Sequence, residues 1–170
     1  MSILIVDDSP DQQALLRSIL GKAGHADVLS ADSARAAAHV LNLDGNSATQ
    51  NIDLILMDVL MPDQDGVETC RQIKRCAHLE DIPIIMVTAK ADLSNLQEAF
   101  AAGAMDFISK PVNSIELLAR VASALRFRGL AWARTSAAVS FMRTCLHEAA
   151  SGVRPVGGAG FDGRLTPPRH

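Results

Sequence analysis

The chain has 170 residues, of which 48% are hydrophobic, 21% charged and 4% aromatic, and its formal net charge is −3. This apolar fraction is sufficient for a buried core and excludes a chain that is disordered throughout. Apolar runs such as residues 52–57 and 82–87 have the length of strands and fall far short of the ~20 residues of a membrane span. The first eight residues lack a basic segment and soon reach two acids, unlike a signal peptide, so we expect a cytoplasmic protein.

The three cysteines and five histidines form no recognisable site. Cys70, Cys76 and Cys145 are odd in number and include no CxxC pair, so the sequence indicates neither a disulfide framework nor a zinc site. We expect reduced thiols on helices. The histidines are scattered, without the spacing of metal ligands or of a catalytic base.

The distribution of charge divides the chain after Leu125. Residues 1–125 hold nine Lys and Arg against 17 Asp and Glu, whereas residues 126–170 hold seven Arg against two acids. We predict a single patterned domain over residues 1–125, a helical extension over 126–150 and a flexible tail over 151–170, where five Gly and three Pro occur. The Arg-rich part shows no sequence pattern of a nucleic-acid-binding fold, so we expect no nucleic-acid binding.

Five apolar segments of strand length follow one another along the predicted domain. They cover residues 2–6, 28–29, 53–57, 83–87 and 106–109. The segment at 28–29 is the weakest. Those at 53–57 and 83–87 are almost continuously apolar, which is typical of strands buried on both faces of a sheet.

A helical pattern follows each predicted strand. The starts of these helices are Ser9-Pro10-Asp11-Gln12, Asp32 or Ser33, Val67 after the turn 61–66, Asp92, and Asn113-Ser114-Ile115-Glu116. Ser, Asp and Asn at such positions accept hydrogen bonds from the first free amides of a helix. The first four helices are predicted to end near Gly21, Leu43, Ala77 and Ala102, and a loop is predicted at 44–47.

Strands that alternate with helices predict an α/β fold, with a parallel sheet covered by helices on both faces. Right-handed crossovers bring the carboxyl ends of all strands to one edge, where such sheets bind ligands. The residues that follow the strands there are Asp7, Asp8, Asp58, Thr88 and Lys110. We therefore predict a pocket of three carboxylates, a hydroxyl and an ammonium group at this edge.

This set of side chains indicates phosphoryl chemistry. Three neighbouring carboxylates repel one another unless a cation lies between them, and Mg²⁺ prefers such oxygen ligands. Mg²⁺ and Lys110 together would neutralise charge on a transferring phosphoryl group, and the hydroxyl of Thr88 can donate to a phosphoryl oxygen. A carboxylate can act as the nucleophile and form an aspartyl phosphate.

Four motifs resemble those of one family. They are ILIVDD at 3–8, MDVLMPDQDG at 57–66, VTA at 87–89 and AGAMDFISKP at 102–111. In these motifs residues 1–125 resemble the receiver domain of bacterial two-component response regulators, and are similar to the single-domain chemotaxis response regulator. The resemblance implies a five-stranded, flavodoxin-like (βα)5 fold with strand order 2-1-3-4-5.

The resemblance also implies roles for the acidic residues. Asp58 matches the phosphoacceptor and a ligand of Mg²⁺. Asp8 matches a direct ligand, Asp7 an acid that usually acts through water, and the backbone carbonyl of Leu60 the third protein ligand. Leu60 and Lys90 occupy positions that tune the lifetime of the phosphoryl group, and because Leu60 cannot orient a water we predict a long-lived aspartyl phosphate.

The remaining matched positions imply a switch. Thr88, Ala89 and Lys110 match the residues that bind the phosphoryl group, and Thr88 and Phe107 match the pair that changes conformation. The face of the fourth helix, fifth strand and fifth helix would then contact a downstream effector protein or a second copy of the chain. A sensor histidine kinase or a histidine phosphotransfer protein would supply the phosphoryl group, so we expect a signalling domain and not an enzyme.

The sequence speaks against two other functions. A haloacid dehalogenase-type enzyme needs a second acid two residues after its nucleophile, where this chain has Ser9 or Leu60. A nucleotide-binding protein would carry a GxGxxG or P-loop after the first strand, and none is present. An interaction module that needs no phosphorylation remains the alternative. The abrupt change after Leu125 also suggests a remnant of a lost output region.

Overall fold

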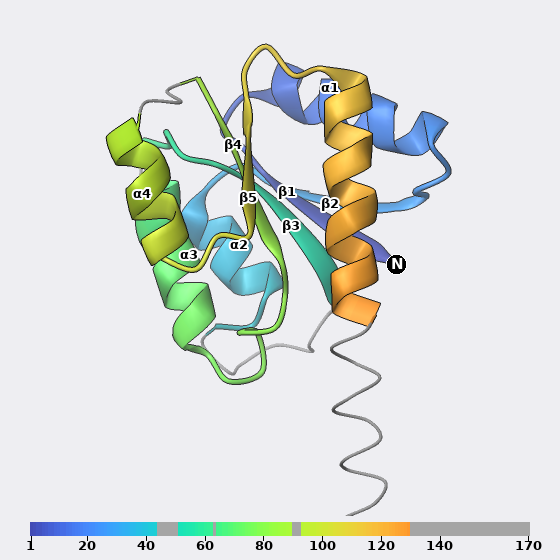
Figure 1. The fold of residues 1–170 in the computed structure, drawn as a ribbon. Coiled ribbons are helices and arrows are strands. Elements are labelled where there is room, and N and C mark those ends of the chain that lie inside the picture. Colours follow the sequence, from blue (N-terminus) through green and yellow to red (C-terminus); the bar gives the residue numbers. More distant parts are fainter. Residues whose placement is uncertain (44–50, 63, 90–92, 130–170) are drawn as a thin grey trace, which may run out of the picture. The chain divides into compact units, whose positions relative to one another are not determined.

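The computed structural model describes residues 1–43, 51–62, 64–89 and 93–129. Strands and helices alternate along this part of the chain, as the sequence predicts (Figure 1). The strands are β1 (Ser2–Val6), β2 (Asp27–Ala31), β3 (Ile52–Asp58), β4 (Ile84–Thr88) and β5 (Asp106–Ser109). The helices are α1 (Pro10–Lys22), α2 (Ala34–Val40), α3 (Gly66–Arg75), α4 (Leu93–Ala101) and a last helix whose described part covers residues 114–129.

The five strands form one parallel sheet in the order β2-β1-β3-β4-β5, which confirms the predicted topology. The register fixes which strand ends are neighbours. Val6 at the end of β1 pairs with Met57 of β3, and Asp58 at the end of β3 pairs with Val87 of β4. The carboxyl ends of the three central strands therefore meet at one edge.

The side chains of successive residues in each strand point to opposite faces of the sheet. Leu4 and Met57 belong to the apolar cluster under α2, α3 and α4, whereas Ile5 and Leu56 belong to the cluster under α1 and the last helix. Figure 1 shows these helices in two layers with the sheet between them. Both faces of the central strands are buried, which explains why their sequences are almost continuously apolar.

Side chains cap the helices at most of the predicted starts. The hydroxyl of Ser9 accepts from the amide of Gln12 at 3.4 Å, and the carboxamide of Asn113 accepts from two amides of the last helix. Ser33, rather than Asp32, caps α2. This helix ends at Val40, earlier than predicted, and Asn42 beyond it has a left-handed φ of 54°.

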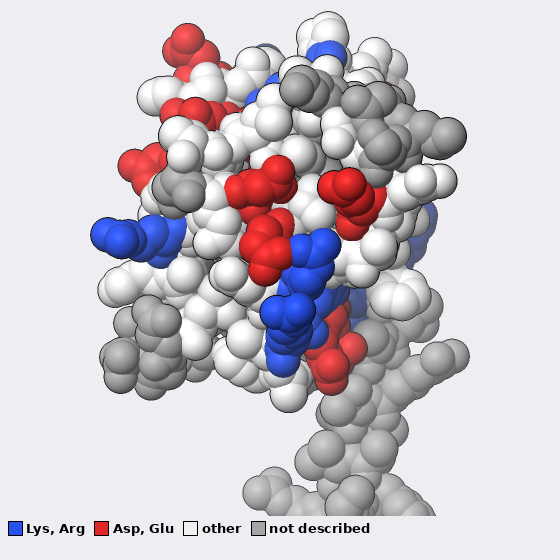
Figure 2. Space-filling model, turned by 90° about the vertical axis from the view of Figure 1, so that its left-hand side faces the viewer, with Lys and Arg blue, Asp and Glu red and all other residues white. Residues whose placement is uncertain are grey.

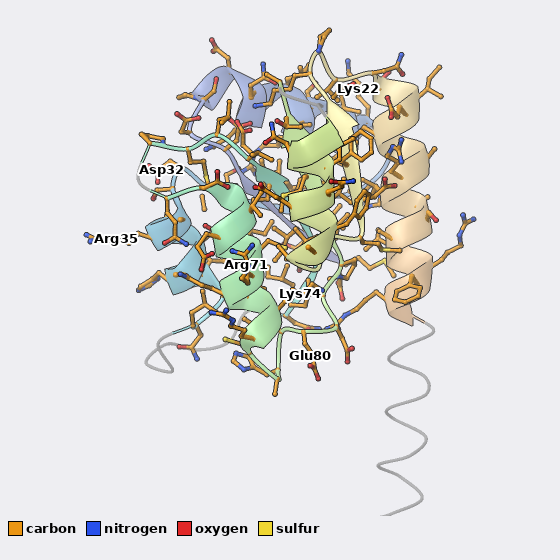
Figure 3. All side chains as sticks on the ribbon, turned by 60° about the vertical axis from the view of Figure 1, so that its left-hand side comes forward. Lys22, Asp32, Arg35, Arg71, Lys74 and Glu80 are labelled. Atoms are coloured by element: carbon orange, nitrogen blue, oxygen red, sulfur yellow. The ribbon has the colours of Figure 1, made fainter. Side chains whose placement is uncertain are left out.

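Lys74, near the end of α3, contacts the segment that leads into β4. Its Nζ donates to the carbonyl oxygens of Glu80 at 2.6 Å and Ile82 at 2.7 Å, which ties the end of α3 to the segment before β4. Burial lowers the pKa of Lys74 below its ordinary value. Figure 2 shows acidic and basic side chains mixed over the face of α3 and α4. Figure 3 places Lys74 and Glu80 toward one end of the molecule and Asp32, directly after β2, toward the other.

Several sequence predictions fall outside the described residues. They concern the loop at 44–47, Lys90, the cap at Asp92, Cys145, most of the extension over 126–150 and the tail over 151–170. In the described part, no helix has both the length and the apolar character needed to cross a membrane.

Candidate functional site

The register of the sheet brings together the predicted acids. Since Val6 pairs with Met57, Asp7 follows β1 beside Asp58 at the end of β3. Oxygen atoms of Asp7, Asp8 and Asp58 lie within 4.8 Å of one another. Asp7 and Asp58 are 1% and 6% exposed, whereas Asp8 is exposed to solvent. Two carboxylates are thus sheltered at the floor of the site, and the third lies at its rim.

Backbone amides hold the two buried carboxylates in place. The amide of Ser9 donates to Oδ1 of Asp7 at 2.9 Å, and the amide of Leu60 donates to Oδ1 of Asp58 at 3.2 Å. Nε2 of Gln13, on α1, donates to the carbonyl oxygen of Asp7 at 2.7 Å. The loops after β1 and β3 therefore fold back over their own acids, which leaves Oδ2 of each acid for other partners.

Lys110 bridges those two free oxygens. Its Nζ lies 2.9 Å from Oδ2 of Asp7 and 2.6 Å from Oδ2 of Asp58. Burial by itself lowers the pKa of Lys110, but hydrogen bonds and charge from Asp58 and Asp7 outweigh it, so the pKa lies above its ordinary value. Lys110 thus remains an ammonium group and offsets part of the negative charge of the cluster.

The end of β4 lies on the other side of Asp58. Thr88 is the last residue of β4, is 2% exposed and follows Val87, the partner of Asp58. Its carbonyl oxygen accepts from the backbone amide of Lys110 at 2.8 Å, and Ala89 after it is exposed. The structure therefore gathers Asp7, Asp8, Asp58, Thr88 and Lys110 at one edge, as the strand ends predict.

Gly66 belongs to this site, although sequence reasoning placed it only in a turn. It is the first residue of α3, and its amide donates to the carbonyl oxygen of Val59 at 2.9 Å. A Cβ atom on Gly66 would lie 1.9 Å from the backbone oxygen of Asp58. Its φ is not left-handed, so the requirement for glycine comes from this close approach. The only sign of this requirement in the sequence is a glycine directly after Asp65, the residue that caps α3.

These side chains form a donor set that suits a hard divalent cation. Carboxylate and carbonyl oxygens are the ligands that Mg²⁺ prefers, and it binds with few protein carboxylates and several waters. Asp7, Asp8 and Asp58 supply clustered carboxylates, and the loop after Asp58 brings backbone groups close to it. The residues present therefore fit Mg²⁺, with Lys110 beside them as a fixed cation.

Comparison with known proteins assigns the family. The family model described as the response regulator receiver domain matches residues 3–122. This chain belongs to that family. The match covers the sheet except its first residue, Ser2, together with the five residues of the site. Receivers of this family generally bind Mg²⁺ at an acidic pocket.

In the curated relatives, the region that matches this chain is only part of a longer protein. A probable cyclic di-GMP phosphodiesterase of Vibrio cholerae is 39% identical over 120 residues, which are 71% of this chain and 25% of that protein. The phosphate regulon transcriptional regulatory protein PhoB of Pseudomonas aeruginosa is 38% identical over 128 residues, which are 75% of this chain and 53% of that protein. This chain thus spans a quarter to about half of the length of these relatives.

Solved structures agree with the fold of the receiver. The receiver domain of a signal transduction histidine kinase from Syntrophus aciditrophicus has a TM-score of 0.65 and 36% identity, over 74% of this chain and 89% of that chain. The chemotaxis protein CheY4 of Vibrio cholerae has a TM-score of 0.64 and 28% identity, over 72% of this chain and 97% of that chain.

Phe107, the aromatic residue predicted to switch in this receiver, lies on β5, the strand next to β4. Phe107 is half-buried on β5 and pairs with Met86, two residues before Thr88. Phe107 and Thr88 therefore belong to positions of the same face on neighbouring strands. The ring of Phe107 contacts Phe100 of α4 and lies under the guanidinium of Arg120 from the last helix.

Proposed function

We propose that this receiver accepts a phosphoryl group on Asp58 from a sensor histidine kinase or a histidine phosphotransfer protein. The observation that carries the proposal is the convergence of three carboxylates with Lys110, whose Nζ is 2.6 Å from Asp58. An oxygen of Asp58 attacks the phosphorus of the donor phosphohistidine. The new O–P bond forms as the N–P bond breaks, and the freed imidazole takes up a proton from water.

We assign the cation to Asp8, Asp58, the carbonyl of Leu60 and, through water, Asp7. When bound, Mg²⁺ supplies positive charge that stabilises the phosphoryl oxygens in the transition state. Lys110 already contacts Asp58, so its ammonium is within reach of an oxygen on a group attached there. The buried position of Asp58 limits the access of water to the acyl phosphate.

The proposed switch begins at Thr88. Phosphorylation adds charge and three acceptor oxygens at Asp58, and the hydroxyl of Thr88, one residue beyond the partner of Asp58, turns to donate to one of them. Ala89 leaves room for these oxygens. The movement of Thr88 makes space for the ring of Phe107. This shifts the balance between two conformations of the face formed by α4, β5 and the last helix.

Leu60 governs the lifetime of the proposed aspartyl phosphate. Its side chain is 46% exposed and apolar, so it cannot direct a water toward the phosphoryl group. We expect slow hydrolysis in the wild type and a shorter half-life in Leu60→Asn. A wild-type half-life as short as that of fast chemotaxis-type receivers would contradict this assignment.

The proposed outputs are protein contacts made in the cytoplasm. The switched face would bind a downstream effector or a second copy of the chain as a homodimer. On the face of α3 and α4, acidic side chains lie directly beside the basic ones (Figure 2). This supports a protein partner over nucleic acid. Residues 126–150 and 151–170 remain proposed as a helical extension and a flexible tail.

The intact mass of the protein tests the proposal directly. The wild type, incubated with Mg²⁺ and acetyl phosphate or a phosphorylated kinase, should gain one phosphoryl group, and Asp58→Asn should gain none. Asp53→Asn is the matched control, because Asp53 lies on the same strand at the opposite edge. No gain from either donor in a folded protein would contradict the proposal and favour the phosphorylation-independent module.

A further inference from the structure

An aromatic and ionic cluster surrounds the ring of Phe107. Phe100 of α4 meets this ring edge-on, with ring centroids 6.2 Å apart and an interplanar angle of 80°. Arg120, on the last helix, places its guanidinium carbon 5.7 Å from the centroid of the same ring. We call Phe100, Asp106, Phe107, Glu116 and Arg120 the Phe107 clamp.

The guanidinium of Arg120 is held by two acids. Nη1 donates to both oxygens of Asp106 at 2.6 Å, and Nε and Nη2 donate to Oε1 of Glu116 at 3.0 and 2.9 Å. A guanidinium held by several hydrogen bonds loses little freedom when it also covers an aromatic ring. The cation therefore has a defined place over Phe107.

The same network reaches the backbone of Phe107. Asp106 directly precedes it, and the amide of Phe107 donates to Oδ1 of Asp106 at 2.9 Å. Asp106 thus contacts both the residue that moves in the proposed switch and the cation over its ring. On the other side, Phe100 is 47% exposed, so its contact with Phe107 is made at the surface and not in the packed core.

We propose that Arg120 and Phe100 hold the ring of Phe107 in its resting place, and so set the free energy that phosphorylation must supply before the ring moves toward Thr88. This inference rests on the proposed function of Asp58, Thr88 and Phe107. A cation over an aromatic ring at an exposed site, or an edge-on aromatic contact, shifts such an equilibrium by about two- to fivefold. Arg120 and Phe100 are positioning residues, since neither reaches the acids.

The resting protein tests the clamp without any phosphoryl group. With 4-fluorophenylalanine at position 107, fluorine NMR separates the resting and displaced positions of the ring. Arg120→Met and Phe100→Ala should each raise the displaced population by about two- to fivefold. Arg71→Met is the matched control, because Arg71 pairs with Glu68 on α3 and lies outside the clamp. An unchanged population in both clamp variants would overturn the inference.

Beryllofluoride with Mg²⁺ provides the second readout on the full chain. It mimics the phosphoryl group, and its apparent affinity rises in proportion to the competent population, so Arg120→Met should bind it about two- to fivefold more tightly. In a Phe107→Ala background the same substitution should change nothing, and an equal gain there would overturn the inference.

The two proposals fail in different ways. If the wild type binds beryllofluoride and accepts a phosphoryl group but the clamp variants behave as the wild type does, only the clamp is wrong. If the wild type does neither, the function proposed for Asp58 is wrong, and the clamp is wrong with it.

Discussion

Replacement of Gly66 by alanine should damage both the stability and the chemistry of the receiver. Gly66 begins α3 directly against the carbonyl of Asp58, and its added Cβ would lie 1.9 Å from that oxygen and 3.0 Å from Cα of Val59. Real Cβ atoms rarely approach within 3.0 Å of another heavy atom, and all the atoms met here belong to the backbone. No side chain can rotate away, so α3 or the end of β3 must move.

The size of the effect follows from this geometry. Overpacking of this kind typically destabilises a protein by about 1–3 kcal/mol. The higher helix propensity of alanine returns at most about 1 kcal/mol, and less at the first position of a helix. We therefore expect the free energy of unfolding to fall by about 1–2 kcal/mol. The loop between Asp58 and α3 should also shift, which displaces Leu60 from the acceptor and slows phosphorylation.

Urea unfolding, together with the rate of mass gain from acetyl phosphate, measures both effects. Gly21→Ala is the matched control, because nothing lies within 4 Å of a Cβ at Gly21 in α1. It should be neutral or stabilising, with an unchanged rate of phosphorylation. If Gly66→Ala were as stable and as reactive as Gly21→Ala, the close approach to Asp58 would not constrain this position.

Three further predictions concern other parts of the receiver. Asp8→Asn removes one of the clustered charges and should weaken Mg²⁺ binding by at least about tenfold. Added Mg²⁺ should then raise the unfolding temperature less than it does in the wild type. The control variant Asp81→Asn should bind Mg²⁺ as the wild type does. Burial raises the pKa of the Cys70 thiol from 9.0 to about 11. Because the unfolded chain loses this proton first, the free energy of unfolding should fall as the pH rises through that interval. In urea titrations across the same pH interval, Cys70→Ala should lose less stability than the wild type. In a variant with Cys70 as its sole thiol, labelling at pH 8 should require unfolding; rapid labelling of the native protein would contradict its burial. Asp65→Ala removes the cap that accepts from Val67 at 2.6 Å and should lower the free energy of unfolding by about 1 kcal/mol, an effect that Asp65→Asn should largely avoid.

Most of the fold could be predicted because its signals are local. Apolar runs of strand length, capping residues such as Ser9 and Asn113, and their alternation specify five parallel strands between two layers of helices. The ends of some helices and strands differ from the prediction, because tertiary contacts decide them. Asn42 lies in a left-handed conformation just after the end of α2, and Thr88 pairs with Ser109 and so belongs to β4 instead of following it.

The acids and Lys110 could also be predicted as neighbours, because parallel strands deliver their ends to one edge. Gly66 and the Phe107 clamp could not. The importance of Gly66 depends on how closely α3 approaches β3, and that separation is set by packing, not by residues 61–66 alone. Arg120 meets Asp106 and Phe107 only because the last helix returns beside β5.

The sequence by itself determined the α/β architecture, the strand ends that carry the acids, and the family to which the chain belongs. These depend on periodicity and on residues within a few positions of one another. Only the tertiary structure decided that Lys110 ties Asp7 to Asp58, that Gly66 leaves no room for a side chain, and that Arg120 covers Phe107. Each of these contacts joins segments whose distance is fixed by the packing of helices on the sheet, a property of the whole domain and not of any one segment.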